Sequence, residues 1–409
     1  MKYCILVGDG MSDRPVPELG GKTPLEAARI PNMDRLAREG RLGTAVTVPE
    51  ALPSGTDVAM LAVMGYEPAR YYCGRAPLEA ASMNVVLAEG DVAFRCNLVT
   101  ADDVMEDYSA GHISTEEAAE LLKAVAAKID LPYVELYPGV SYRHLLVVRS
   151  EAANHGDRGL DALLATRCVP PHDIAGQRLD GYLPQGPAAE FIRGMMDASK
   201  SVLAKHEVNR RRVAAGKAPA TMIWLWGQGP SPSLPTFAEL YGVSGGVVSA
   251  VNVVFGIAAI AGLEIIKVPG ATGYFDTNYE GKVEAALDAL SRHDLALLHV
   301  EATDEAGHMG DPQLKVRAIE DFDRRVVGPM LAGLAKLGPA RVLVCPDHAT
   351  PLSVRGHVHD DVPYAVWGAG IPASGAKGFF ETEARRLSGS PLPGHMLMKE
   401  LLSPERSGV

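Results

Sequence analysis

The feature that most constrains the fold is an alternation of short apolar runs with helical patterns. The apolar or β-branched runs lie at 3–7, 222–226, 295–300 and 341–345 and lead into Gly, Asp or His residues. The helical patterns lie at 24–39, 247–262, 281–291 and 313–336. This alternation predicts an α/β domain with a mostly parallel sheet. Ligands of such sheets bind beyond the carboxyl ends of the strands, so we expect the chemistry in the segments that follow them.

A second domain is predicted inside the first. A chain of 409 residues is longer than one ordinary compact domain. Between 74 and 186 the pattern changes to short strands at 92–98 and 142–148 and one amphipathic helix at 115–127. We therefore predict a discontinuous core domain, 1–73 and 187–409, with an inserted α+β domain at 74–186. The run 222–226 is predicted to be a strand of the core.

Charge and cysteine usage exclude several classes of protein. The formal net charge of −11 opposes binding to nucleic acid or to an anionic membrane, because both repel an acidic protein. Five scattered cysteines without a C-x-x-C pair are typical of reduced thiols in a cytoplasmic protein. The apolar stretch 247–261 is shorter than the roughly 20 residues of a membrane span, and we interpret it as a core helix. An anionic substrate would need a local cluster of cations.

Carboxylate and imidazole side chains follow three of the predicted strands. The candidates are Asp9 after the first run, Asp304 and His308 after 295–300, Asp347 and His348 after 341–345, and His357 soon afterwards. Mixed carboxylate and imidazole ligands suit manganese, zinc, cobalt or iron. Taken alone, the Asp304 and His308 pair could be a helix-surface pair, and Asp347 with His348 could form a turn or a helix cap. Their coincidence at three strand ends favours a metal site.

A hydroxyl nucleophile is available in the segment 53–59. Ser54 and Thr56 lie at a predicted loop-to-helix junction, where a hydroxyl can coordinate metal and a helix N-terminus can stabilise an anion. The alternative is an ordinary N-cap, with Asp57 complementing the helix dipole. Only the neighbouring ligand candidates favour the catalytic interpretation.

Several motifs occur together in the order of a known family. They are Gly8-Asp9-Gly10, 55–59, 65–68, 304–308 and 346–348, with further matches at 109–115, 171–173 and 270–273. Over essentially its whole length the chain resembles the archaeal-type cofactor-independent phosphoglycerate mutases of the alkaline phosphatase superfamily. The resemblance implies an alkaline phosphatase-like core, with a mostly parallel sheet between helices, and a smaller inserted α+β domain.

The resemblance also implies a binuclear site. One ion would be held by Asp9, Thr56, Asp347 and His348, and the other by Asp304, His308 and His357. Manganese is the first choice, with zinc, cobalt or magnesium as alternatives, and 2,3-bisphosphoglycerate is not needed. The chain departs from the family at Thr56, where serine is usual, so Ser54 is kept as a fallback nucleophile. His359 competes with His357, which is preferred because it matches the family position.

The substrate is expected to bind on the inserted domain, across a cleft from the metals. Arginine suits this role because a guanidinium grips phosphate and carboxylate with two hydrogen bonds. The candidates are Arg75, Arg95, Arg143, His112, His172 and Asp173. Each has a structural alternative, as a surface ion pair, a partner of a buried carboxylate, or a turn residue.

The resemblance implies an isomerase that interconverts 3-phosphoglycerate and 2-phosphoglycerate through a phosphothreonine at Thr56. One alternative is another metal-dependent phosphotransferase or phosphatase, such as a homoserine kinase-like enzyme. A second alternative is a non-catalytic metal-binding relative. The expected partner is a small anionic phosphorylated metabolite in the cytoplasm, and the oligomeric state, including a homo-oligomer, is left open.

Overall fold

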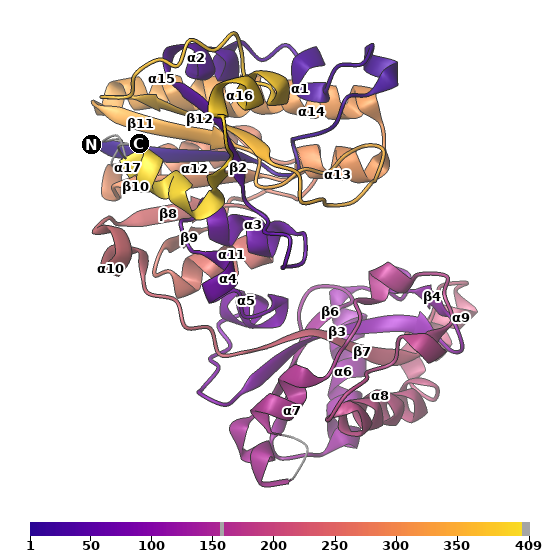
Figure 1. Cartoon of the computed structure of the whole chain (residues 1–409). Coiled ribbons are helices and arrows are strands. Elements are labelled where there is room, and N and C mark those ends of the chain that lie inside the picture. The colour runs from indigo at the N-terminus through magenta and orange to yellow at the C-terminus, as the bar shows by residue number, and fades with distance from the viewer. Residues whose placement is uncertain (156–158, 403–409) are drawn as a thin grey trace. The chain divides into compact units, whose positions relative to one another are not determined.

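The computed structural model describes residues 1–155 and 159–402, and these form two compact units. The first unit contains Met1–Tyr72 together with the chain from Leu234 onward, and the second contains Cys73–Ser233. Figure 1 shows the elements of each unit. Among the described helices, none combines the length and the apolar character that crossing a membrane would require.

The first unit is built on an eight-stranded sheet in the order β13-β2-β12-β11-β1-β10-β8-β9. The strands are β1 (Lys2–Gly8), β2 (Arg41–Val46), β8 (Gly245–Val248), β9 (Glu264–Ile266), β10 (Leu295–Val300), β11 (Ala340–Cys345), β12 (Val362–Gly368) and β13 (Leu392–Pro393). Strand β1 pairs in parallel with both β10 and β11, whereas β12 runs antiparallel to its two neighbours. The predicted mostly parallel sheet is confirmed.

The register of the central strands aligns their carboxyl ends. Val7 in β1 lies opposite His299 in β10 and opposite Cys345 in β11. Asp9 and Asp347 each follow two residues beyond this level. Three adjacent strands therefore deliver polar side chains to the same edge of the sheet, as expected for parallel strands.

Helices cover both faces of this sheet (Figure 1). Alternate residues of β1, such as Cys4 and Leu6, pack into a core shared with α2 (Pro31–Glu39), α12 (Tyr279–Arg292), α14 (Pro312–Phe322) and α15 (Gly328–Leu337). On the other face, α11 (Asn252–Ile260) contacts β8, α17 (Leu397–Leu402) contacts β11, and α3 (Thr56–Val63) packs on both helices. Strands buried on both faces explain why the runs are continuously apolar rather than alternating.

Two predicted helices differ from the structure in their bounds. The pattern 24–39 is split into α1 (Pro24–Ala27) and α2, because Pro31 lacks an N–H and disfavours helical geometry at Ile30. The start of the predicted helix 247–262 belongs instead to β8, and α11 begins at Asn252. The pattern 281–291 lies within α12, and 313–336 spans α14, the π-helical segment Asp323–Val327 and α15.

The second unit contains an antiparallel sheet. Its path is β4 (Met105–Asp107), β3 (Val92–Ala101), β6 (Arg143–Val148) and β5 (Val134–Tyr137), and β7 (Met222–Pro230) pairs with β3. Helices α6 (Thr115–Ile129) and α8 (Ala189–Leu203) share its larger core, and α5 (Arg75–Ser82) packs in a smaller one. An α+β arrangement was expected here.

The second unit extends beyond the predicted boundary at 186. The run 222–226 was expected in the core sheet, but it lies in β7, which pairs antiparallel with β3, and α8 packs against it. An apolar run that is buried on both faces carries no information about which sheet it joins, since the pairing is decided by residues distant in sequence. The unit therefore runs to Ser233 rather than to residue 186.

Candidate metal centre

Asp9 and Asp347 are buried at the carboxyl ends of β1 and β11, with exposed fractions of 1% and 0%. One oxygen of Asp347, Oδ1, accepts hydrogen bonds from the backbone N–H groups of Gly10 (3.0 Å) and His348 (2.8 Å). Gly10 has a φ of +56°, and a Cβ there would lie 2.3 Å from Asp304 Oδ1. Glycine is therefore required where the chain passes between the carboxylates.

The first candidate ligand group contains Asp9, His299 and Asp347, whose ligand atoms all lie within 4.8 Å of one another. Both carboxylate oxygens of Asp9, Oδ2 of Asp347 and Nε2 of His299 are buried without a hydrogen-bond partner. Burying an uncompensated carboxylate is costly, and most buried polar atoms have partners. A divalent cation between these atoms would satisfy them together, so the residues fit a metal ion.

The second group is centred on Asp304, near the start of α13 (Ala302–Met309). Asp304 Oδ2 lies 3.1 Å from Nε2 of His308, one helical turn later, and Oδ1 lies 3.6 Å from Nε2 of His357. The two imidazole Nε2 atoms are 3.1 Å apart. The Thr350 hydroxyl donates to Asp304 Oδ1 and fixes the carboxylate. Convergence of two imidazoles on one carboxylate is typical of a transition-metal site.

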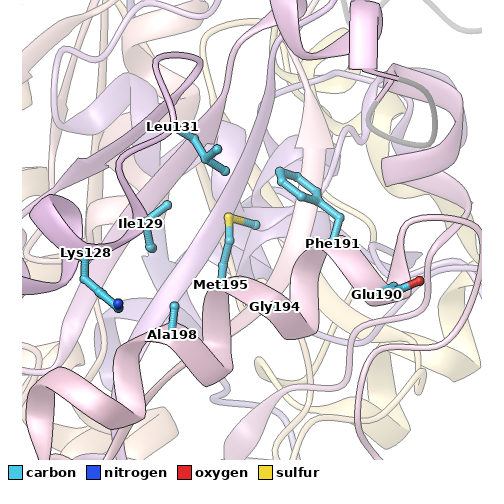
Figure 2. Close-up of a pocket in the computed structure, with 8 residues that line it drawn as sticks. All are labelled: Lys128, Ile129, Leu131, Glu190, Phe191, Gly194, Met195 and Ala198. Atoms are coloured by element: carbon cyan, nitrogen blue, oxygen red, sulfur yellow. The ribbon is translucent and has the colours of Figure 1, made fainter.

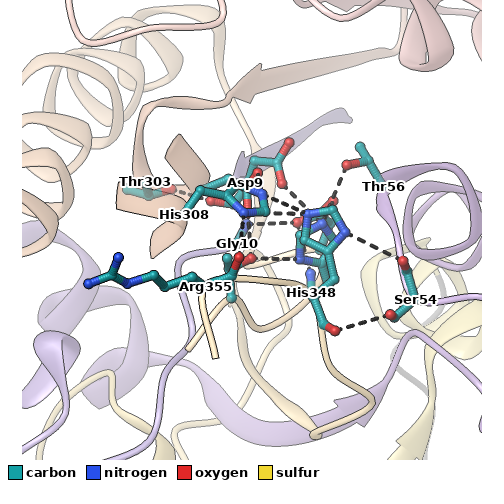
Figure 3. A network of polar contacts seen from close by, with 12 residues as sticks. Asp9, Gly10, Ser54, Thr56, Thr303, His308, His348 and Arg355 are labelled. Carbon is teal, nitrogen blue, oxygen red and sulfur yellow. Dashed lines mark hydrogen bonds and ion pairs between the residues drawn. The ribbon is translucent and has the colours of Figure 1, made fainter. Parts of the chain in front are cut away.

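His348 lies where the two groups adjoin. Its Nε2 is 3.3 Å from Asp9 Oδ1 and 3.5 Å from Asp347 Oδ2. It also belongs to a ligand set with Asp304 and His357, and its ring centroid is 4.2 Å from that of His357. The residues predicted as ligands from three separate strand ends thus come together in one place (Figure 3). Their division between two ions stays a prediction.

Burial sets the protonation of the centre. Burial raises the pKa of Asp9 well above its usual value, and the charge of Asp347 adds to this effect. Burial lowers the pKa of His299 to about 4 and that of His348 to about 3, which keeps both imidazoles neutral. The hydrogen bond with Asp304 raises the pKa of His308 to about 9. An ion binding to His308 would therefore displace a proton.

Of the two hydroxyls predicted as nucleophiles, that of Thr56 lies against a candidate ligand. Thr56 is the first residue of α3, and its Oγ1 lies 3.4 Å from His348 Nε2 (Figure 3). The Ser54 hydroxyl instead donates to the backbone carbonyl of His357 at 3.1 Å. His359 is exposed, and its Nε2 contacts the carbonyl of Leu52 at 2.9 Å. The geometry thus favours Thr56 over Ser54 and His357 over His359.

Within the second unit, two of the predicted substrate residues share one carboxylate. Arg75 and Arg95 lie 3.2 and 3.0 Å from the carboxylate of Glu79. Arg95 is 5% exposed, and its guanidinium stacks over Trp226 at 4.5 Å. Burial lowers the pKa of Arg95 to about 10, so it keeps its charge at neutral pH. Arg95 is a preorganised buried cation rather than a solvated surface residue.

Aromatic rings connect the other predicted substrate residues. His172 contacts Trp226 and Tyr108 with ring centroids 5.2 and 6.1 Å apart. Tyr108 contacts Tyr142, which in turn contacts His112 and lies under the Arg143 guanidinium at 5.3 Å. Asp173 lies beside His172 at 3.6 Å. All the substrate candidates therefore fall in one cluster of cations and aromatic rings.

Two residues of these clusters were missed from the sequence. Trp226 lies in the run 222–226 and is 5% exposed, as in core packing, but its ring also contacts Arg95 and His172. His299 was overlooked although it stands as the only polar residue of the run 295–300, one position before the strand ends. That position at a carboxyl edge was the signal available for His299. No sequence signal distinguished Trp226 from an ordinary core tryptophan.

A separate pocket in the second unit is unrelated to these groups. Its volume is about 540 Å³, and it lies between the end of α6 and one side of α8 (Figure 2). The lining residues are Lys128, Ile129, Leu131, Glu190, Phe191, Gly194, Met195 and Ala198. None of them is a predicted ligand or substrate residue, and the pocket adds nothing to the candidate site.

A buried lysine supports the loops that carry the ligands. Lys315 of α14 is 0% exposed, and its Nζ lies 2.8 Å from Asp13 Oδ2. The same ammonium donates to the carbonyls of Thr350 (2.7 Å) and Ser12 (3.3 Å). Lys315 therefore ties the segment after β1 to the segment after β11.

Replacing Lys315 by methionine is expected to lower the free energy of unfolding by about 3 to 5 kcal/mol, because it leaves the Asp13 carboxylate buried without its cation. Denaturant unfolding of the chelator-treated protein would measure the loss. The matched control is Arg14→Met, whose guanidinium pairs with Asp360 at 2.7 Å on the surface. An exposed pair contributes about 1 kcal/mol or less. Equal losses in both variants would contradict the structural role of Lys315.

The fold and the site define an α/β protein with a candidate binuclear metal centre at the carboxyl edge of its sheet. A family model described as 2,3-bisphosphoglycerate-independent phosphoglycerate mutase matches residues 37–209. Proteins of that name from Methanothrix thermoacetophila and Methanosarcina acetivorans are 51% and 53% identical, over 98% and 90% of this chain and 100% and 90% of theirs. The chain belongs to the family of 2,3-bisphosphoglycerate-independent phosphoglycerate mutases.

Solved structures agree with this assignment. A Pyrococcus horikoshii protein superimposes with a TM-score of 0.82 at 29% identity, covering 100% of this chain and 99% of its own. A cofactor-independent phosphoglycerate mutase from Thermoplasma acidophilum gives a TM-score of 0.65 at 27% identity, covering 99% of this chain and 100% of its own. Both proteins thus share the fold of the described residues.

Proposed function

We propose that this protein interconverts 3-phosphoglycerate and 2-phosphoglycerate through a phosphothreonine at Thr56, without 2,3-bisphosphoglycerate. The observation that carries the proposal is the position of Thr56 Oγ1, 3.4 Å from the imidazole that joins the two candidate ligand groups. Family membership supplies the reaction. The substrate would be a small anionic metabolite, and we place the reaction in the cytoplasm.

The metal part of the proposal rests on the donor set. The first ion would bind Asp9, Asp347 and His348 with Thr56, and the second would bind Asp304, His308 and His357. Carboxylate with imidazole suits manganese, with cobalt, zinc or magnesium as alternatives. When bound, such cations would lower the pKa of a hydroxyl and neutralise charge on the phosphoryl oxygens.

In the proposed mechanism, Thr56 Oγ1 attacks phosphorus in line and the bond from phosphorus to the glycerate 3-oxygen breaks. The proton lost by Thr56 ends on that departing oxygen. The glycerate then turns, and its 2-hydroxyl takes the phosphoryl group while its proton returns to Oγ1. Arg75, Arg95 and Arg143 would hold the glycerate carboxylate and phosphate during this exchange.

Phosphorus NMR tests the proposal directly. The manganese-loaded protein is incubated with 3-phosphoglycerate in the absence of 2,3-bisphosphoglycerate, and we expect a growing 2-phosphoglycerate signal. Release of free phosphate alone would show that the protein is a phosphatase and not a mutase. Absence of both products from the metal-loaded protein would contradict the substrate assignment.

A further inference from the structure

We propose that His299 is a direct ligand of the ion held by Asp9 and Asp347. This inference rests on the metal part of the proposed function and adds a residue that neither the motifs nor the family resemblance assigned.

The register places His299 near the carboxyl edge of the sheet, two positions before the level of the two carboxylates. His299 lies opposite Val7 in β1, and Asp9 follows two residues later. In β11 the residue opposite Val7 is Cys345, and Asp347 again follows two residues later. Ligand atoms of all three side chains lie within 4.8 Å of one another. Three adjacent strands therefore present one nitrogen and two carboxylates to one point.

The approach of His299 to Asp9 is close but is not a hydrogen bond. Nε2 lies 3.0 Å from Asp9 Oδ2, yet both atoms are buried and neither has a hydrogen-bond partner. A ring N–H must point toward its acceptor, and here it does not. Two unpaired acceptor atoms at this distance are expected when both bind the same cation, with metal–ligand distances near 2 Å.

The remaining atoms of His299 are held in place. Its Nδ1 lies 3.2 Å from the hydroxyl oxygen of Ser249, the residue that follows β8. Its backbone carbonyl accepts a hydrogen bond from the buried ammonium of Lys282 at 3.2 Å. An Nδ1–H that donates to Ser249 leaves the lone pair of Nε2 free for a metal. Fixing the second ring nitrogen in this way is the usual arrangement for a ligating histidine.

The competing role is a positioning one, in which Nε2–H donates to Asp9 and only the carboxylate binds metal. Glutamine separates the two roles. A His299→Gln side chain can donate an N–H to Asp9 from nearly the same place, but it cannot supply an imidazole nitrogen to the ion. If His299 only positions Asp9, His299→Gln should keep the metal binding that His299→Ala loses. If His299 is a ligand, both variants should bind the ion weakly.

The test is calorimetric titration of chelator-stripped protein with Mn²⁺, followed by the visible absorption spectrum with Co²⁺. The wild type should bind two ions. In His299→Ala, one of them should weaken by at least about 10- to 100-fold while the other keeps its affinity. His299→Gln should stay weak and should not restore the wild-type cobalt bands.

His144→Ala is the matched control. His144 is also a strand histidine, 2% exposed, with a buried and unpaired Nε2, but it lies in β6 of the second unit. The His144→Ala variant should bind both ions as the wild type does. Circular dichroism and thermal unfolding in chelator confirm that each variant is folded before titration.

The outcomes separate this inference from the proposed function. Wild-type affinity and spectrum in His299→Ala, or full restoration by glutamine, would overturn the ligand role and leave the mutase intact. A wild type that binds two ions but has no mutase activity would overturn the substrate assignment. The ligand role of His299 would then still be decided by the His299 variants. A wild type that binds no ion would overturn both.

Discussion

Replacing Thr56 by alanine is expected to lower kcat for 2-phosphoglycerate formation by roughly 10³- to 10⁶-fold, the range found when a covalent nucleophile is removed. The change deletes a hydroxyl that is 8% exposed at the first residue of α3. Alanine has the best helix propensity, so the fold should survive. The buried carboxylates and imidazoles stay in place, and metal binding should be reduced but not lost.

The assay for Thr56 combines steady-state kinetics with a chemical trap. Acid quenching of the wild type during turnover, followed by peptide mass spectrometry, should find phosphate on the Thr56 peptide. Thr56→Ser keeps the hydroxyl and should keep most activity. Ser54→Ala should lose far less than Thr56→Ala, because its hydroxyl is directed at the His357 carbonyl. If Ser54→Ala were inactive and Thr56→Ala active, the nucleophile would be Ser54 and not Thr56.

The fold could be predicted wherever sequence periodicity and strand ends are local signals. The runs 3–7, 295–300 and 341–345 lie in β1, β10 and β11, and their parallel pairing follows from the helices between them. The run 222–226 was assigned to the wrong sheet because its pairing with β3 is set by residues more than a hundred positions away. Local patterns report burial, but they do not report the partner strand.

The candidate site could be predicted where a polar residue stands at a strand end. Asp9, Asp304 and Asp347 were found for this reason, and the structure brings them together. His299 is different, because it lies inside an apolar run. Its position just before the strand end was a signal, but its closeness to Asp9 is seen only in the register of the sheet. Its role depends on a neighbouring strand, which the sequence alone does not position.

Replacing Asp304 by asparagine is expected to remove one of the two ions and to lower mutase activity by at least about 10³-fold. The two Asp304 carboxylate oxygens lie 3.1 Å from His308 Nε2 and 3.6 Å from His357 Nε2. The asparagine amide has nearly the same shape as the carboxylate, but it lacks the negative charge that would bind a cation between these imidazoles. Metal analysis after gel filtration should give one ion per chain instead of two. Thermal unfolding should show less stabilisation by Mn²⁺, which contributes about 2.7 kcal/mol per site when the free ion is at 100 times its Kd.

Asp323→Asn provides the matched comparison for this substitution. Asp323 is also buried, with 1% of its surface exposed against 5% for Asp304. Its carboxylate accepts from the backbone N–H of Asn32 (3.2 Å) and of Met33 (2.7 Å) and touches none of the ligand groups. It should therefore keep two ions and mutase activity, whatever its effect on stability. If Asp304→Asn also kept two ions at wild-type affinity, the group of Asp304, His308 and His357 would not be a metal site. If Asp304→Asn lost its ion but remained active, the reaction would need only the ion at Asp9 and Asp347, and phosphoryl transfer to Thr56 would be a one-metal process.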